Sequence, residues 1–187
     1  MSAPEPTSDR SDGLFLWLLR HAKAVPDVPA GGSDHDRPLA PRGRRDAAAL
    51  GLRLRAGELG FGADAVPGLV LASTAARTSE TAQAVASALG LPVERRRRLY
   101  YGSPTDMLDE LRTLEDAPRA VMVVGHNPAT HALALELLAD DDEAGRAGLD
   151  AFSTCAVALL RAAVGKWRDL EYGTATLVGF SRPPYDR

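Results

Sequence analysis

The fold of this chain is decided by the stretch Leu14-Phe15-Leu16-Trp17-Leu18-Leu19-Arg20-His21. Its first six residues are all apolar and lack the polar alternation of a half-exposed strand. An unbroken apolar run of this kind is typical of a strand buried on both faces of a parallel sheet. The run is far too short to cross a bilayer, so we expect no membrane partner. We therefore predict a central strand whose carboxyl end carries Arg20 and His21.

The rest of the chain alternates between strand-like and helix-like segments. Strands are expected at 69–72, 93–99 and 120–124, and helices at 43–59, 73–89, 103–114 and 129–138. Near the C-terminus, 152–160 and 166–172 flank Val164-Gly165, which predicts an antiparallel hairpin at a sheet edge. This order predicts the α/β class: a three-layer sandwich with a mostly parallel central sheet, helices on both faces and an antiparallel C-terminal edge.

The length of 187 residues fits one domain. We expect a disordered tail over 1–12, a single domain over 13–182 and a C-terminal tail over 183–187. The first twelve residues are polar and lack the apolar core of a signal peptide, which favours a cytoplasmic location. The single cysteine, Cys155, excludes an internal disulfide framework. It lies in the apolar segment 153–157, which we expect to be a buried strand with a core thiol.

The charge balance argues against a nucleic-acid partner. The 22 basic residues face 25 acidic ones, for a formal net charge of −3, whereas nucleic-acid binders carry a basic excess. All but Lys23 and Lys166 of the basic residues are arginine, the side chain best suited to bidentate anion contacts. The most basic run is Arg95–Arg98. It fits either a dock for an acidic partner or a solvated edge strand, and its shortness favours the second.

Cationic side chains follow three of the predicted strands. Arg20 and His21 end the first, Arg77 comes shortly after Ser73-Thr74 at the end of the second, and His126 follows the third. The carboxyl ends of parallel strands form one crevice, so we expect these side chains to meet there. Arg77 falls in the first turn of its helix, where the helix dipole disfavours a cation and a bound anion would relieve the penalty.

Two arginines, two histidines and two helix N-termini suit a phosphoryl group better than a metal. A zinc site is poorly supported because His126 and His131 are five residues apart and no nearby carboxylate completes a ligand set. Imidazole is itself a competent nucleophile toward phosphorus. His35, in the long loop 25–41, could border the pocket, but its acidic neighbours favour a simply exposed position.

Four ordered motifs resemble the histidine phosphatase superfamily, also called phosphoglycerate-mutase-like. They are the segments 18–23 with Arg20-His21-Ala22-Lys23, 36–43, 71–82 with Arg77, and 123–128 with Gly125-His126-Asn127-Pro128. The first is similar to the form found in SixA-type phosphohistidine phosphatases. The resemblance extends from about Leu14 to Phe180, in matching order and spacing.

The resemblance implies that His21 is a nucleophile that becomes transiently phosphorylated. Arg20, Arg77 and His126 would then form the phosphate pocket together with His21, and water would hydrolyse the phosphohistidine. It implies neither a metal nor an organic cofactor. Asn127 is expected to cap the following helix.

The sequence departs from the larger family members at the proton donor. Those members place a glutamate or aspartate where this chain has Leu99-Tyr100-Tyr101-Gly102. An alkoxide is a poor leaving group without such an acid, whereas imidazole leaves readily once protonated. The function expected first is therefore a phosphatase acting on protein phosphohistidine, with a phosphorylated protein domain as partner.

Two alternatives remain. One is a broad phosphomonoesterase acting on small phosphate esters with the same pocket. The other is a weakly active module that binds phosphoproteins without hydrolysing them. No strong apolar helix face is left over in the sequence, so we expect a monomer.

Overall fold

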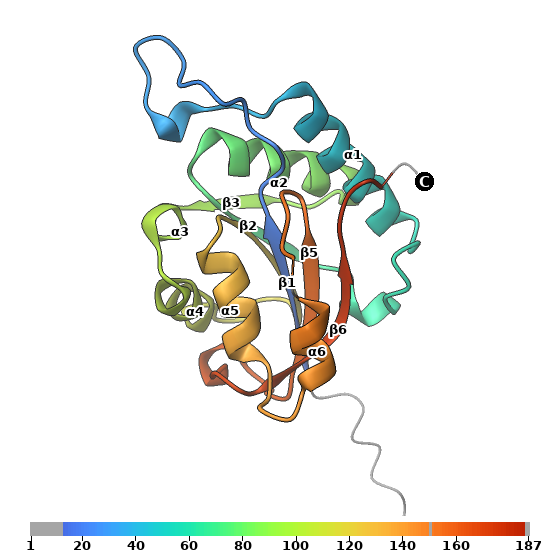
Figure 1. The fold of residues 1–187 in the computed structure, drawn as a ribbon. Coiled ribbons are helices and arrows are strands. Elements are labelled where there is room, and N and C mark those ends of the chain that lie inside the picture. Colours follow the sequence, from blue (N-terminus) through green and yellow to red (C-terminus); the bar gives the residue numbers. More distant parts are fainter. Residues whose placement is uncertain (1–12, 150, 186–187) are drawn as a thin grey trace, which may run out of the picture.

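The computed structural model describes residues 13–149 and 151–185. The tail expected over 1–12 lies outside this part of the chain. A six-stranded sheet occupies the centre, in the order β3-β2-β4-β1-β5-β6 (Figure 1). The strands are β1 Leu14–Arg20, β2 Leu69–Ser73, β3 Val93–Arg96, β4 Ala120–Gly125, β5 Val157–Ala162 and β6 Ala175–Ser181. The strands β3, β2, β4 and β1 run parallel to one another. β5 is antiparallel to β1, and β6 is antiparallel to β5, which gives the predicted antiparallel edge.

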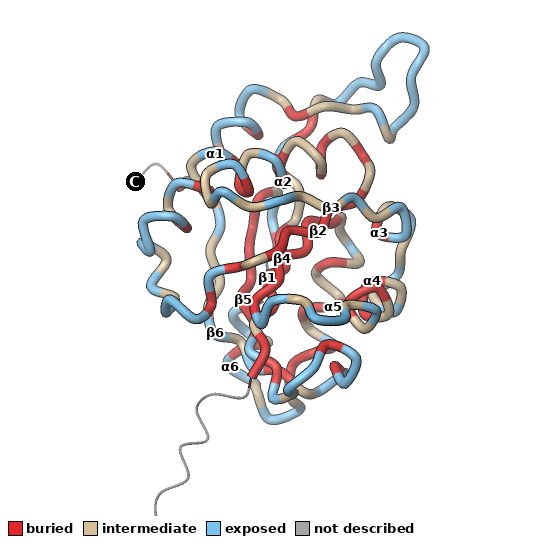
Figure 2. The backbone as a smooth tube through the Cα atoms, turned by 180° about the vertical axis from the view of Figure 1, so that it is seen from behind, coloured by how far each residue is buried: buried red, intermediate tan, exposed pale blue. Residues whose placement is uncertain are grey.

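Helices cover both faces of the sheet. The helices are α1 Pro41–Arg55, α2 Ala76–Leu89, α3 Arg98–Tyr101, α4 Pro104–Arg112, α5 Ala129–Leu137 and α6 Glu143–Gly148. Successive residues of β1 serve opposite faces: Leu16 and Leu18 pack toward α4 and α5, while Trp17 and Leu19 pack toward α1 and α2. The central strands are buried along their length (Figure 2). The three-layer α/β class is thereby confirmed.

Local sequence signals account for most helix boundaries. Pro41 and Pro104 occupy first helical positions, where a missing N–H costs nothing. The helix α2 ends at Gly90, whose φ of 70° is the left-handed conformation that glycine adopts without strain. None of the described helices has the length and apolar character needed to cross a membrane.

The C-terminal hairpin differs from the prediction. Its second strand is β6 at Ala175–Ser181, not 166–172, because Trp167 leaves the sheet in a short 3-10 turn. There its ring is buried and its Nε1 donates to the Pro118 carbonyl. The first strand, β5, pairs with β1 as well as with β6, so it lies inside the sheet.

Three smaller expectations also need correction. Cys155 is a buried thiol as expected, but it lies in a turn with φ of 62° before β5, not in a strand. The edge strand predicted over 93–99 ends at Arg96, because α3 begins two residues later. Tyr185, expected in a C-terminal tail, is buried and its hydroxyl donates to the Cys155 carbonyl. The packed chain therefore extends past 182.

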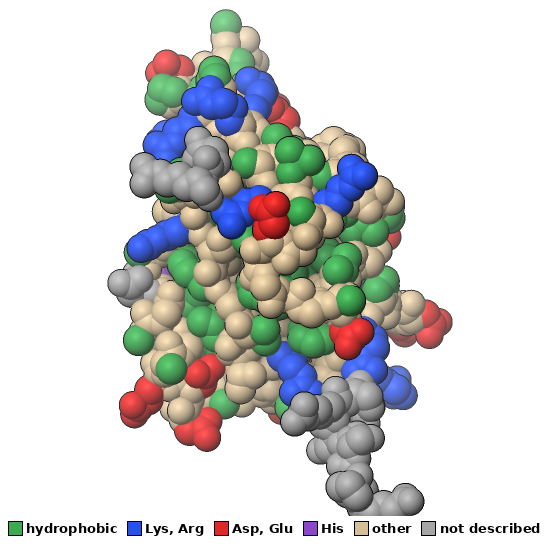
Figure 3. Space-filling view, turned by 90° about the vertical axis from the view of Figure 1, so that its right-hand side faces the viewer, with side chains coloured by type: hydrophobic (Ala, Val, Ile, Leu, Met, Phe, Trp, Pro, Cys, Tyr) green, Lys and Arg blue, Asp and Glu red, His purple; other side chains and the backbone are tan. Residues whose placement is uncertain are grey.

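Basic side chains are dispersed over the surface. Figure 3 shows one face of the molecule, on which Lys and Arg are interspersed with carboxylates. Within the Arg95–Arg98 run, Arg96 pairs with Glu94 and Glu110, and Arg98 pairs with Asp106. These internal pairs fit the solvated-edge interpretation better than a free basic dock.

Candidate active site

Strand register brings the predicted residues together at the carboxyl edge of the sheet. Arg20 lies beside Gly125, and Ala72 lies beside Val124, so β1, β2 and β4 end level with one another. The residues that follow these strands therefore meet. The rings of His21 and His126 have centroids 5.2 Å apart, and Ser73 at the end of β2 contacts His126.

His21 is held in one tautomer with an unprotonated ring nitrogen. Its Nδ1 lies 2.8 Å from the Ala22 carbonyl, an acceptor only, so Nδ1 carries the proton and Nε2 keeps its lone pair. Burial lowers the pKa of His21 to about 4; the hydrogen bond to Ala22 opposes this, and the charges of Arg77 and Arg20 add to it. The ring is therefore uncharged at neutral pH, as a nucleophilic imidazole must be.

His126 presents its other nitrogen. Ser73 Oγ accepts a hydrogen bond from the Ala75 amide and lies 2.8 Å from His126 Nε2. We infer that the serine donates its proton to Nε2, which leaves a proton on His126 Nδ1. Burial lowers the pKa of His126 to about 3, with the charges of His21 and Arg77 acting in the same direction. His126 therefore offers a neutral N–H donor.

Arg20 is oriented by the chain segment that precedes β5. Its Nη1 donates to the Phe152 carbonyl at 2.8 Å, and Asn127 Nδ2 donates to the same oxygen at 3.0 Å. Asn127 is therefore not the helix cap that the sequence predicted, since the N-cap of α5 is Pro128 and no side chain caps that helix. Its amide instead braces the carbonyl that holds Arg20.

Arg77 is only 6% exposed, at the start of α2. Its two Nη atoms are both engaged by Asp34: Nη1 donates to the main-chain oxygen at 2.7 Å and Nη2 to the carboxylate at 3.0 Å. Asp34 lies in the loop after β1, which is closed at its base by a bridge between Ala24 and Leu39. Figure 1 shows this loop projecting from the end of β1 before it returns to α1.

Three of the four predicted residues carry a buried donor without a partner. These atoms are Arg20 Nε, Arg77 Nε and His126 Nδ1. Buried polar groups are rarely left unpaired, and unpaired ones point to a bound ligand or a functional role. Two guanidinium N–H groups and an imidazole N–H favour an oxyanion as ligand, and the N-termini of α2 and α5 favour the same charge. The arrangement is thus suited to a tetrahedral anion that faces an imidazole nucleophile.

Sequence reasoning missed two side chains at this site, Asp34 and Tyr100. The Tyr100 ring lies 5.6 Å from the ring of His126, its centroid is 6.0 Å from Arg77 Cζ, and its hydroxyl donates to Asp34 at 3.2 Å. His35, expected to be exposed, is half-buried, and its ring packs 4.8 Å from that of Tyr100. Their positions in the sequence could have indicated both side chains, because Asp34 and Tyr100 follow the carboxyl ends of the parallel strands β1 and β3.

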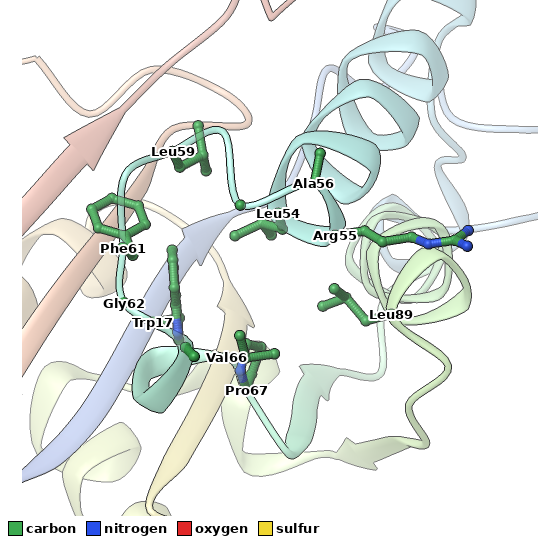
Figure 4. A pocket seen from close by; sticks show the side chains of 12 residues that line it. Trp17, Leu54, Arg55, Ala56, Leu59, Phe61, Gly62, Val66, Pro67 and Leu89 are labelled. Carbon is green, nitrogen blue, oxygen red and sulfur yellow. The ribbon is translucent and has the colours of Figure 1, made fainter.

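Other parts of the described chain offer no competing chemistry. Among residues 13–149 and 151–185 there is no group of three or more His, Cys, Asp or Glu side chains arranged to hold a metal ion. A hollow of about 300 Å³ lies elsewhere, between the end of α1 and Trp17 (Figure 4). Its lining is mainly apolar and includes none of the predicted site residues.

Comparison with known proteins agrees with this geometry. Residues 16–100 match the family described as the histidine phosphatase superfamily (branch 1). An uncharacterized protein of Mycobacterium tuberculosis is 39% identical over 168 residues, which cover 88% of this chain and 99% of that one. A second such protein, from Mycobacterium leprae, is 36% identical over 174 residues, with the same coverage.

Solved structures give the same result. The chain superposes with a TM-score of 0.78 and 34% identity on a protein from Nakamurella multipartitia assigned as phosphohistidine phosphatase SixA, covering 93% of this chain and 98% of that one. A protein from Agrobacterium tumefaciens with the same assignment gives a TM-score of 0.70 at 30% identity, covering 92% and 100%. The resemblance stated from the four motifs is confirmed.

Proposed function

The chain belongs to the histidine phosphatase superfamily, and on that premise we propose that it hydrolyses protein phosphohistidine through a covalent phosphohistidine on His21. The observation that carries the proposal is the set of three unpartnered buried donors beside this imidazole. The two SixA-assigned structures, each at least 30% identical over almost the whole chain, support the phosphohistidine substrate.

In the first step, the phosphoryl oxygens accept hydrogen bonds from Arg20 Nε, Arg77 Nε and His126 Nδ1. His21 Nε2 donates its lone pair to phosphorus as the bond to the leaving group breaks, and the electron pair of that bond departs with the leaving group. In the proposed step these donors act on equatorial oxygens that gain charge, which would stabilise the transition state more than the ground state.

In the second step, water attacks the phosphorus of phospho-His21. The phosphorus–nitrogen bond breaks, His21 Nε2 recovers its electron pair, and the proton of the attacking water passes to the phosphate oxygens or to solvent as inorganic phosphate forms. The hydrogen bond from Nδ1 to the Ala22 carbonyl holds the ring in one orientation through both steps. No group other than water is consumed.

The leaving group favours phosphohistidine over a phosphate ester. The carboxylate that contacts the site, Asp34, receives hydrogen bonds from Arg77 and Arg37, and a carboxylate so bound is a poor proton donor. An alkoxide needs a strong donor, whereas imidazole departs neutral once its second nitrogen is protonated.

The experiment is a trap combined with a selectivity measurement. The wild-type protein is incubated with a chemically phosphorylated histidine peptide and quenched in alkali, and phospho-His21 is located by mass spectrometry. We expect labelled His21, release of phosphate, and little hydrolysis of sugar phosphates. The reverse selectivity would identify the general phosphomonoesterase instead.

The variant His21→Ala separates the enzyme from a binding module. We expect it to lose turnover while it still binds the phosphohistidine peptide, since the three donors remain. If turnover in the wild type is no higher than in His21→Ala, the chain is a binding module. We also propose that the single domain predicted over 13–182, which the packing of Tyr185 extends beyond that limit, acts as a cytoplasmic monomer. Size-exclusion chromatography with light scattering tests the oligomeric state.

A further inference from the structure

A carboxylate stands among the cations of the proposed phosphate site. Asp34 Oδ2 accepts from Arg77 Nη2 at 3.0 Å and from Tyr100 Oη at 3.2 Å, and Oδ1 accepts from Arg37 Nε at 2.8 Å. A carboxylate has about four acceptor positions, so these three donors leave room for one more. The side chain of Asp34 is 53% exposed, and a ligand can therefore reach that position.

Asp34 is held in the charged form. Its slight burial acts to raise the pKa, but the hydrogen bond from Arg37 and the positive charges of Arg77 and Arg37 outweigh it and hold the pKa below its usual value. At neutral pH the group accepts protons in hydrogen bonds and does not donate one. It therefore cannot replace the missing general acid.

A charged carboxylate repels the oxygens of a phosphoryl group, so its useful partner must be part of the leaving group. Phosphohistidine offers such a partner. Its ring has a second nitrogen, and once protonated this nitrogen is a cationic N–H donor. An alcohol has no equivalent group, because the proton it needs must reach the oxygen whose bond breaks.

We propose that Asp34 is a specificity-determining residue that accepts a hydrogen bond from the protonated second ring nitrogen of a substrate phosphohistidine. The inference rests on the proposed function and deepens it, since it names the group that selects a phosphorus–nitrogen bond. As that bond breaks, its electron pair goes to the ring nitrogen that carried phosphorus. The proton stays on the other nitrogen, and the ring leaves as neutral imidazole.

Tyr100 fixes the carboxylate for this role and lines the space beside it. Its hydroxyl donates to Asp34 Oδ2, and its ring lies 4.8 Å from His35 and 5.6 Å from His126. Aromatic rings pack favourably edge-to-face at such separations, so these contacts hold Tyr100 beside Asp34. The orientation of the Asp34 acceptor is thereby fixed within the proposed site.

A purely structural role makes a different prediction. Asp34 also orients the Nη atoms of Arg77, and losing that support weakens phosphate binding for every substrate equally. The ratio of kcat/KM between two substrates removes this shared effect. Suitable substrates are the phosphorylated histidine peptide and 4-nitrophenyl phosphate, whose leaving group departs without a proton.

The test compares Asp34→Asn with Asp27→Asn, which removes an exposed carboxylate from the same loop. Hydrogen bonds to charged groups typically correspond to about a 10- to 100-fold change. For Asp34→Asn we expect kcat/KM for the peptide, divided by kcat/KM for 4-nitrophenyl phosphate, to fall by at least about tenfold. In Asp27→Asn the same quotient should stay within about twofold of the wild-type value. An unchanged ratio in Asp34→Asn overturns the inference even when both activities fall.

A pH profile gives a second readout that orientation of Arg77 would not move. With the peptide, kcat, which reports ionisations in the enzyme–substrate complex, should fall at alkaline pH as the bound substrate ring loses its proton, and Asp34→Asn should shift this limb to lower pH. Coincident limbs in wild type and variant contradict the inference alone. A wild type that cleaves 4-nitrophenyl phosphate but not the peptide overturns the proposed function and this inference together.

Discussion

Ser73 controls which nitrogen His126 presents to the phosphoryl group, and Ser73→Ala removes that control. The serine side chain is fully buried, and its hydroxyl lies 2.8 Å from His126 Nε2. In the variant, Nε2 has no donor, so the proton moves to Nε2 in a share of molecules. The lone pair on Nδ1 then faces the phosphoryl oxygens and repels them.

The magnitude follows from the cost of an unpaired buried acceptor. Leaving such a group without a partner costs about 1–3 kcal/mol, and each 1.4 kcal/mol corresponds to about a tenfold change in rate. Because the variant ring can shift to its other tautomer, we take the lower half of that range. We expect kcat/KM to fall by about 5- to 30-fold with every phosphorylated substrate.

The assay measures kcat/KM with the phosphorylated histidine peptide and with 4-nitrophenyl phosphate at neutral pH. Ser87→Ala is the control, since it removes an exposed hydroxyl from α2, the helix that follows Ser73, where the Ser87 hydroxyl accepts from Gln83. Circular dichroism verifies that both variants fold. If Ser73→Ala stays within about twofold of Ser87→Ala on both substrates, the tautomer argument is refuted.

Three further predictions concern pH, guanidinium geometry and the C-terminus. His21 and His126 have folded-state pKa values lowered to about 4 and about 3, so between these values and 6.5 the unfolded chain binds more protons than the folded chain. The free energy of unfolding, measured with urea, should therefore rise as pH increases from 4 to 6.5. An equal pH slope in the His21→Ala, His126→Ala double variant would contradict this. Arg77→Lys keeps the positive charge, but a lysine cannot bind both oxygens of Asp34 and a phosphoryl oxygen. We therefore expect kcat/KM to fall by about 100-fold. A loss below about fivefold would show that the charge alone suffices. Tyr185→Phe removes the donor to the Cys155 carbonyl and should lower the free energy of unfolding by about 1 kcal/mol in urea denaturation, whereas an unaltered value would mean that the contact is not formed in solution.

The sheet and the four cationic residues could be predicted because short-range signals specify them. The apolar runs of β1, β2 and β4 have no interpretation other than buried elements, and strand ends converge by topology alone. Arg20, His21, Arg77 and His126 were therefore identified without knowledge of any side-chain contact. Their meeting at one edge is a consequence of strand direction.

The remainder depends on contacts between distant segments. Asp34 begins a single 3-10 turn within the long loop after β1, and nothing in its sequence neighbours indicates that Arg77, 43 residues away, binds it. Asparagine is a common N-cap residue and Asn127 precedes a helix, yet its side-chain amide donates to the Phe152 carbonyl instead. The sequence placed the second hairpin strand at 166–172 because Trp167 is apolar, as strand residues often are. Its indole is instead buried in the core outside the sheet.

The carbonyl of Phe152 has a consequence for synthesis on the ribosome. Arg20 donates to this oxygen across 132 residues of sequence, and the Cys155 amide donates to the carbonyls of Arg20 and His21. A nascent chain that has reached His21 therefore lacks the groups that orient this residue and Arg20 until Phe152 and Cys155 have been added. We expect translation products that stop before Cys155 to be silent toward phosphorylated proteins.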